Sequence, residues 1–275
     1  MQRLARAVPI RAGAAATRWG ILRPATAGGA HGGVAAPTVL AAVQGRGMAS
    51  LAATLDAITL EIPQKEAVRY HKGNVKWTRA DVKKHSDALA SGLLDLGCKP
   101  GDTMAVWLPE CSEKHVAQLA AAKAGMILAE VDPALTSAAA FEKVLEESRA
   151  RVVLVGEDGL AGLKEAVPEL RHYSSAKGLP FRSRRFPDLH LCLHTGLDAD
   201  RALSNFKSVL LYHPMPSPLP KVQALVQDDT PLTTPFAVGA GGAPVKGPTL
   251  SQAEVLEKGA WATVAAILSK KYVEV

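Results

Sequence analysis

Short apolar runs alternate with longer amphipathic segments along the chain from Glu66 to Val155. Uninterrupted apolar runs predict buried strands, whereas apolar residues that recur every three or four positions predict helices. The predicted strands are 67–70, 75–77, 103–108, 126–131 and 152–155, and the predicted helices are 79–96, 112–124 and 137–149. The first two strands form a hairpin. Because strands and helices then alternate, the sequence predicts an α/β fold, a parallel sheet with flanking helices and right-handed crossovers.

Capping residues support these helix boundaries. Thr78, with Asp81 three residues later, predicts a capped helix start, and Ser137 predicts a second. Gly97 and Gly125 follow the last apolar residue of their helices, where glycine favours termination.

The pattern is less regular beyond Gly156. It predicts a helix over 157–170, a strand over 189–193, and one helix over 252–273 with a short tail. Four prolines at 214, 216, 218 and 220 predict an extended surface segment over 212–220. The chain is thus divided into a leading segment 1–48, a domain 49–251, and a C-terminal helix and tail 252–275.

The first 50 residues contain six arginines and no acidic residue. Arginine-bearing, alanine-rich and acid-free composition is typical of an organelle transit peptide. We expect residues 1–48 to be a mitochondrial transit peptide and the protein to lie on the matrix side of the inner membrane. A chloroplast peptide and a disordered tail that is never removed are the alternatives.

The charge of the remaining chain is balanced. The net charge is +6, and outside those six arginines 26 basic residues face 26 acidic residues. This balance predicts no nucleic-acid partner. No apolar run reaches the 18 to 20 residues of a membrane-spanning helix, so membrane association is expected only through a partner complex. Three cysteines without a paired motif favour a reducing compartment over a disulfide framework.

One short segment offers metal-ligating side chains. His190, Cys192 and His194 alternate along a predicted strand and share one face of it. Nitrogen and sulfur are ligands that zinc prefers, but three ligands on one strand are cramped and no fourth ligand is apparent. We interpret the segment as a core strand, with a metal site as the weaker alternative.

A glycine-rich segment carries the chemistry that the sequence suggests best. It runs Gly239-Ala240-Gly241-Gly242-Ala243-Pro244-Val245-Lys246-Gly247. Glycine-rich loops hold phosphate oxygens with backbone N–H groups, hydroxyl donors and a lysine. The segment resembles the signature of acyl-adenylate-forming enzymes, the AMP-dependent acyl-CoA synthetase/ligase family, which has the form Thr-Ser-Gly-Thr-Thr-Gly-x-Pro-Lys-Gly.

The resemblance leaves a degenerate phosphate loop. Gly239, Gly241, Gly242, Pro244, Lys246 and Gly247 supply what remains of it. With Pro244 as the anchor, the serine of the signature falls on Val238 and its two threonines on Ala240 and Gly241, while Val245 separates the proline from the lysine.

The same resemblance extends over residues 54–251, through Trp77-Thr78, Pro100-Gly101-Asp102 and Val131-Asp132-Pro133. It implies that catalysis would be completed by segments beyond the loop, for which 252–275 is too short. We therefore expect a pseudoenzyme without cofactor, metal or catalytic residues. Its partners would be protein subunits of a mitochondrial complex, with respiratory complex I (NADH:ubiquinone oxidoreductase) as the host of this accessory subunit. The alternatives are a regulatory module that still binds a nucleotide or acyl-CoA, and one half of a split acyl-CoA synthetase.

Overall fold

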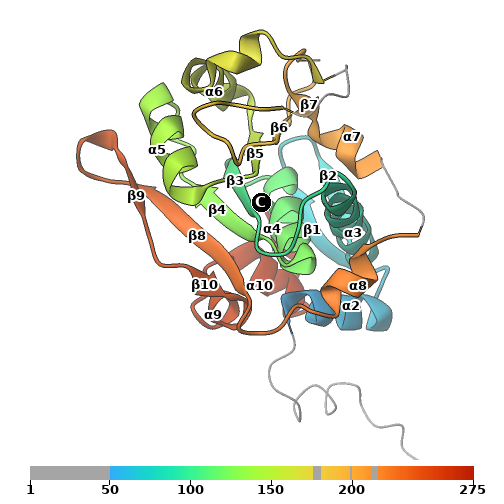
Figure 1. Ribbon diagram of the computed structural model, residues 1–275. Helices are drawn as coiled ribbons and strands as arrows, with labels where there is room; N and C mark the ends of the chain where they lie inside the picture. The colour runs from blue at the N-terminus through green and yellow to red at the C-terminus, as the bar shows by residue number, and fades with distance from the viewer. Residues whose placement is uncertain (1–49, 176–180, 199, 212–215) are drawn as a thin grey trace, which may run out of the picture. The chain divides into compact units, whose positions relative to one another are not determined.

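An eight-stranded sheet organises the part of the chain that the computed structural model describes, residues 50–175, 181–198, 200–211 and 216–275 (Figure 1). The strand order is β10-β8-β4-β3-β5-β6-β7, and β9 pairs with β8 outside this path. The strands are β3 (Thr103–Trp107), β4 (Ile127–Val131), β5 (Val152–Val155), β6 (Leu191–His194), β7 (Ser204–Asn205), β8 (Pro231–Val238), β9 (Pro244–Lys246) and β10 (Leu250–Ser251). All pairs are parallel except those of β8 with β9 and β10. The predicted α/β fold with a largely parallel sheet is confirmed.

Helices cover both faces of this sheet, so each face has its own apolar core. One core takes side chains from α2 (Leu51–Glu61), α3 (Arg79–Asp95), α4 (Ser112–Ala124), α7 (Phe206–Leu211), α8 (Leu219–Gln223), α9 (Gln252–Glu257) and α10 (Ala262–Leu268). The other takes side chains from α5 (Ala138–Ser148) and α6 (Leu160–Ala166).

The central strands divide their side chains between the two cores. Met104 and Val106 of β3 enter the first core, whereas Ala105 and Trp107 enter the second. Successive side chains of a strand point to opposite faces, so a strand covered on both sides is apolar at every position. This explains why the central strands appear in the sequence as uninterrupted apolar runs.

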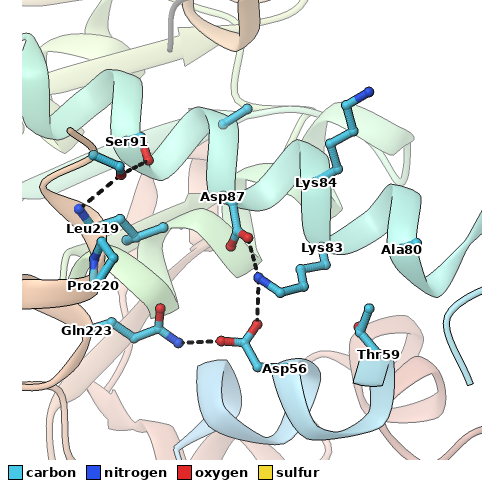
Figure 2. Close-up of a pocket in the computed structure, with 12 residues that line it drawn as sticks. Asp56, Thr59, Ala80, Lys83, Lys84, Asp87, Ser91, Leu219, Pro220 and Gln223 are labelled. Carbon is cyan, nitrogen blue, oxygen red and sulfur yellow. Dashed lines mark hydrogen bonds and ion pairs between the residues drawn. The ribbon is translucent and has the colours of Figure 1, made fainter. Parts of the chain in front are cut away.

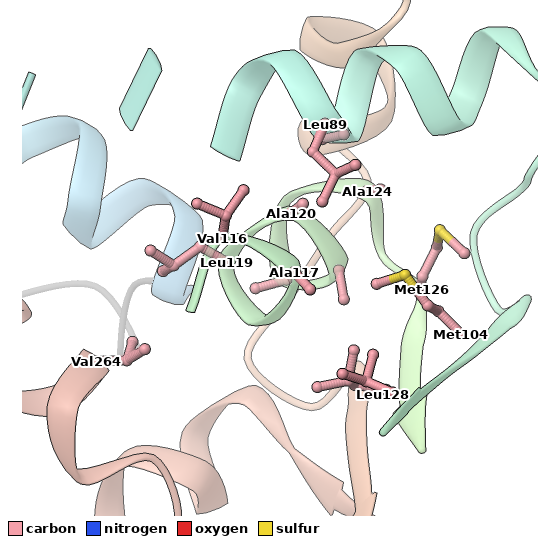
Figure 3. Packing of buried hydrophobic residues seen from close by; sticks show 14 of the residues in the cluster. Leu89, Met104, Val116, Ala117, Leu119, Ala120, Ala124, Met126, Leu128 and Val264 are labelled. Atoms are coloured by element: carbon pink, nitrogen blue, oxygen red, sulfur yellow. The ribbon is translucent and has the colours of Figure 1, made fainter. Parts of the chain in front are cut away.

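Helix α4 lies at the centre of the first core. Figure 3 shows Val116, Ala117 and Ala120 of this helix between Leu89 of α3 and Leu128 of β4. Its alanines let the neighbouring helices and strands approach closely, and the helix is buried almost all round.

A second, smaller sheet joins distant parts of the chain. Strands β1 (Glu66–Tyr70) and β2 (Val75–Thr78) form the predicted antiparallel hairpin. Strand β11 (Val273–Glu274) pairs with β1 in parallel, with Val68 opposite Val273. The described residues belong to one compact unit, so the segment 252–275 packs with the predicted domain rather than apart from it.

Three predicted segments differ from the structure. The helix expected over 157–170 is divided into η1 (Glu157–Gly159), α6 and η2 (Pro168–Arg171), and Pro168, which cannot continue a helix, separates α6 from η2. The helix expected over 252–273 is divided into α9 and α10, because Gly259 adopts a left-handed conformation that ends α9. The proline-rich segment is not extended throughout. Pro220 lies in the first turn of α8, which tolerates proline, while 212–215 are outside the described residues.

The caps and several boundaries are confirmed. Thr78 and Asp81 form a reciprocal capping box at the start of α3, and Ser137 caps α5. Gly125 follows α4 in the left-handed conformation. The predicted transit peptide lies outside the described residues, and within the described part no helix is long and apolar enough to cross a membrane.

Candidate functional site

The six residues of the predicted phosphate loop lie together on the β8–β9 hairpin, which Figure 1 shows extending past α5. The turn is η4 (Ala240–Gly242), in which Gly241 and Gly242 have φ values of 73° and 77°. The Gly239 N–H donates to the Ala243 carbonyl at 2.8 Å, and the Gly242 N–H donates to the Gly239 carbonyl at 3.1 Å. Two of the loop's N–H groups are therefore used within the loop.

The lysine of the loop is engaged outside it. The Lys246 ammonium donates to the Glu147 carbonyl at 3.2 Å. This carbonyl belongs to the last turn of α5, where the negative end of the helix dipole favours a cation. The lysine is therefore held against a helix end and not over the loop.

The hydroxyl side chains of the family signature are missing from this loop, and at one position the backbone conformation disfavours them. The side chains of Val238 and Ala240 carry no hydrogen-bond donor, and Gly241 adopts the left-handed conformation. A β-branched residue in this conformation costs about 1–2 kcal/mol. The residues that the chain places at this loop do not fit a triphosphate and its metal ion.

The weaker metal hypothesis has no support in the geometry. Cys192 and His194 lie on β6, and the Nδ1 of His190 lies 2.6 Å from the Asp188 carbonyl. Within the described ranges, no group of three or more His, Cys, Asp or Glu residues could hold a metal ion. His194 is 1% exposed, and its two ring nitrogens are without a hydrogen-bond partner.

A buried ionic cluster was not predicted from the sequence. Figure 2 shows the pocket beside it, a cavity of about 720 Å³ between α2, α3 and α8. Lys123 of α4 is 0% exposed, and its ammonium contacts Asp56 at 2.9 Å and Asp87 at 2.5 Å. Lys83 bridges the same two carboxylates, and the Gln223 amide donates to Asp56 at 2.8 Å. The sign of the cluster in the sequence is Lys123, a lysine among leucine and alanines in the second half of α4, 119–124.

The ion pairs in this cluster offset the cost of burial. Burial alone would raise the pKa of Asp56, but the Lys123 ammonium and the hydrogen bonds that Asp56 accepts hold it below its usual value. Every charged group of the cluster has a partner of opposite charge within the cluster itself. We therefore interpret it as a structural lock that joins α2, α3 and α4.

A second polar network lies after the carboxyl end of β3. The His115 ring is held between the Tyr70 hydroxyl at 2.9 Å and the Glu110 carboxylate at 2.8 Å. The hydrogen bond with His115, with the contribution of Lys114, lowers the pKa of Glu110 to about 2. Lys114 also bridges Glu110 and Glu130, at 2.5 Å and 2.8 Å. This network fixes the loop after β3 to the start of α4.

The family model of the AMP-binding enzymes matches residues 59–270. The chain belongs to this family. The AMP-binding match covers the eight-stranded sheet, the β1–β2 hairpin, the degenerate loop and the ionic cluster, but neither Asp56 nor β11.

Curated relatives of the chain include acyl-CoA ligases. It is 29% identical over 209 residues to the mitochondrial medium-chain acyl-CoA ligase ACSF2 of Bos taurus, which covers 74% of this chain and 33% of that protein. It is 33% identical over 140 residues to ACSF2 of Rattus norvegicus, covering 49% and 22% of the two chains. The chain thus spans about a third or less of the length of these relatives.

Solved structures confirm the fold of this family member. A putative long-chain-fatty-acid CoA ligase from Rhodopseudomonas palustris superposes with a TM-score of 0.64 at 19% identity, covering 82% of this chain and 56% of the other. The N-terminal domain of FACL13 from Mycobacterium tuberculosis superposes with a TM-score of 0.63 at 16% identity, covering 83% and 57%.

Proposed function

We propose that this chain is a non-catalytic member of the acyl-CoA synthetase family that acts by binding rather than by forming an acyl-adenylate. The observation that carries the proposal is the engagement of Lys246 with the Glu147 carbonyl, in a loop without side-chain hydroxyls. A hydrogen bond to a charged group contributes about 1.5–3 kcal/mol. The loss of even two of the hydroxyl donors of the family signature weakens nucleotide binding by more than about a hundredfold.

The test is ATP–pyrophosphate exchange with Mg²⁺ and decanoate, together with thermal unfolding in the presence of ATP. We expect no exchange above the protein-free rate and no stabilisation by ATP. A bound ligand at a hundred times its dissociation constant would stabilise the chain by about 2.7 kcal/mol. Lys246→Met serves as the matched variant, and Lys258→Met, at the residue that follows α9, as its control. Exchange by the unaltered chain that is lost in Lys246→Met and kept in Lys258→Met would contradict the proposal.

A second function, as an accessory subunit of a mitochondrial complex, extends this proposal. Two features support it: the acid-free, arginine-bearing first 50 residues, and relatives that are named mitochondrial. Large apolar side chains are also exposed by between 73% and 85%, namely Leu60, Leu197, Leu211 and Leu225. We propose the matrix side of the inner membrane as the location and respiratory complex I as the host.

Native electrophoresis of gently solubilised mitochondria, with mass spectrometry of the bands, tests this second function. Co-migration with a respiratory complex is expected. A free species of about the mass of the chain would contradict it. If the isolated complex instead formed an acyl-adenylate in a Lys246-dependent manner, the chain would be one half of a split synthetase.

A further inference from the structure

A groove separate from the degenerate loop lies on the α3/α4 side of the sheet. It has a volume of about 600 Å³ and is lined by β2, α3, α4 and α7. We refer to it as the α3–α7 groove. Its lining residues are Val75, Trp77, Lys84, His85, Ala88, Ser112, Glu113, Val116, Phe206, Lys207, Leu210 and Leu211. Pockets of about 300–1,000 Å³ with apolar walls are the usual size for small-molecule ligands.

The walls of the groove suit an apolar chain. Trp77 and His85 form one wall, with ring centroids 4.8 Å apart and planes inclined by 35°. Burial lowers the pKa of His85, so this ring is neutral at pH 7. Leu210 and Leu211 of α7 supply accessible aliphatic surface to the groove, whereas Phe206 is only 2% exposed.

The groove wall is held in place by a close contact. At Gly92 of α3, an added Cβ would lie 2.7 Å from a methyl carbon of Val209 and 2.8 Å from its carbonyl oxygen. Glycine therefore lets α7 pack directly on α3. The groove is part of the packed fold.

The charges in the groove favour an anion. Lys84 and Lys207 are exposed, and neither has a salt bridge within the part of the chain that the structure describes. The carboxylate of Glu113 is the negative group of the lining, and it accepts a hydrogen bond from the Ser112 hydroxyl at 2.7 Å. Two unpaired ammonium groups beside one carboxylate leave the groove with a positive balance.

An apolar groove with free ammonium groups matches a molecule with a hydrocarbon chain and one negative end. The geometry points to the α3–α7 groove as a binding site for an amphipathic carboxylate, a fatty acid of medium length. The hydrocarbon chain packs along Trp77 and Leu211, and the carboxylate pairs with Lys84 and Lys207. The inference rests on the proposed function in that the carboxylate stays bound and unreacted.

Quenching of Trp77 fluorescence provides a local readout. Of the other three tryptophans, Trp107 and Trp261 are each 3% exposed and do not line this groove, and Trp19 lies outside the described residues, so comparison with Trp77→Phe assigns the signal. Decanoic acid with a terminal bromine quenches a tryptophan that it contacts. We expect saturable quenching in the full chain, competition by unlabelled decanoate, and loss of the quenched component in Trp77→Phe. Isothermal titration with decanoate should show that Trp77→Phe still binds.

Charge reversal tests the carboxylate end. Lys84→Glu and Lys207→Glu should each weaken decanoate binding by about tenfold to a hundredfold, the loss of one charge-assisted hydrogen bond. Both lysines are exposed, so these variants should fold. The control Lys99→Glu alters an exposed lysine in the turn between α3 and β3, which does not line the groove, and should bind decanoate unchanged. Decylamine, with the same chain and the opposite charge, should bind more weakly than decanoate.

The outcomes separate this inference from the proposed function. Absence of saturable quenching, or equal decanoate affinity in the Lys84→Glu, Lys207→Glu and Lys99→Glu variants, would overturn the groove site even if pyrophosphate exchange is absent. Pyrophosphate exchange together with lysine-dependent quenching would refute the proposed function and leave the groove site standing.

Discussion

Replacement of Lys123 by methionine isolates the contribution of the buried ionic cluster. Methionine keeps the unbranched stem but removes the ammonium, so Asp56 and Asp87 retain only Lys83 as a cationic partner. Removing one partner of a buried ion pair costs about 3–5 kcal/mol, because it leaves a buried charge uncompensated. The side chains of the two carboxylates are 29% and 30% exposed, so we expect the lower end, about 3 kcal/mol.

Urea unfolding at pH 7, followed by circular dichroism, measures this loss. With a slope of about 1–3 kcal/mol per molar urea, and the upper end expected for a chain of this size, the midpoint should fall by roughly 1 M. Combining Lys123→Met with Asp56→Asn and Asp87→Asn should recover part of the loss, because no buried carboxylate remains unpaired. Lys99→Met, an exposed control, should stay within about 0.5 kcal/mol of the unaltered chain.

The sign of the pH dependence follows from Asp56. Its pKa is below the usual value in the folded chain, so its contribution is present above the unfolded pKa and is lost as the pH falls. In Lys123→Met, the free energy of unfolding should therefore decrease less as the pH falls. A loss below about 1 kcal/mol at pH 7 in Lys123→Met would refute the interpretation of the cluster as a structural lock.

Three further outcomes are expected from other parts of the fold. Gly162→Ala should lower the free energy of unfolding by about 1–3 kcal/mol or more in urea titrations, because the new Cβ would lie 2.0 Å from the Thr136 carbonyl oxygen; an unchanged midpoint would contradict the close contact. Glu110 should add stability that is present above its unfolded pKa of 4.5 and is lost as the pH falls toward about 2, so the difference in stability between the chain and Glu110→Gln should narrow in acid. Burial raises the pKa of Cys192 to about 12, so iodoacetamide at pH 8 should not modify it before unfolding, as peptide mass spectrometry can verify.

The regular part of the fold could be predicted from the sequence because its rules are local. The boundary of α4, the capping box of Thr78 and Asp81, and the apolar run of β3 each depend on neighbouring residues alone. The predicted single helix over 252–273 was wrong because the apolar period continues across the glycine that ends α9. At Gly259 the backbone conformation, and not the periodicity, decides where the helix ends.

The site could be predicted only in part, for a related reason. The order of glycines and Pro244 located the loop, and the structure places it on one hairpin. The contact of Lys246 with Glu147, and the cluster around Lys123, join residues that are far apart in the sequence. Such partners depend on how elements pack, which neither spacing nor periodicity encodes. The α3–α7 groove was missed because its walls come from four separate elements.

The buried amide of Gln252 has a consequence for how the chain acquires its fold. Its side-chain oxygen accepts a hydrogen bond from the Leu51 N–H at 3.0 Å, and its NH₂ group donates to the Ala122 carbonyl at 2.9 Å. In addition, β11 pairs with β1, the strand that follows α2 in the sequence. The Leu51 N–H and the Ala122 carbonyl, which are synthesised early, therefore gain these hydrogen-bond partners only when Gln252 has been synthesised. Contacts of such high sequence separation slow folding, so the first half of the chain completes its packing only after α9 and β11 have been synthesised.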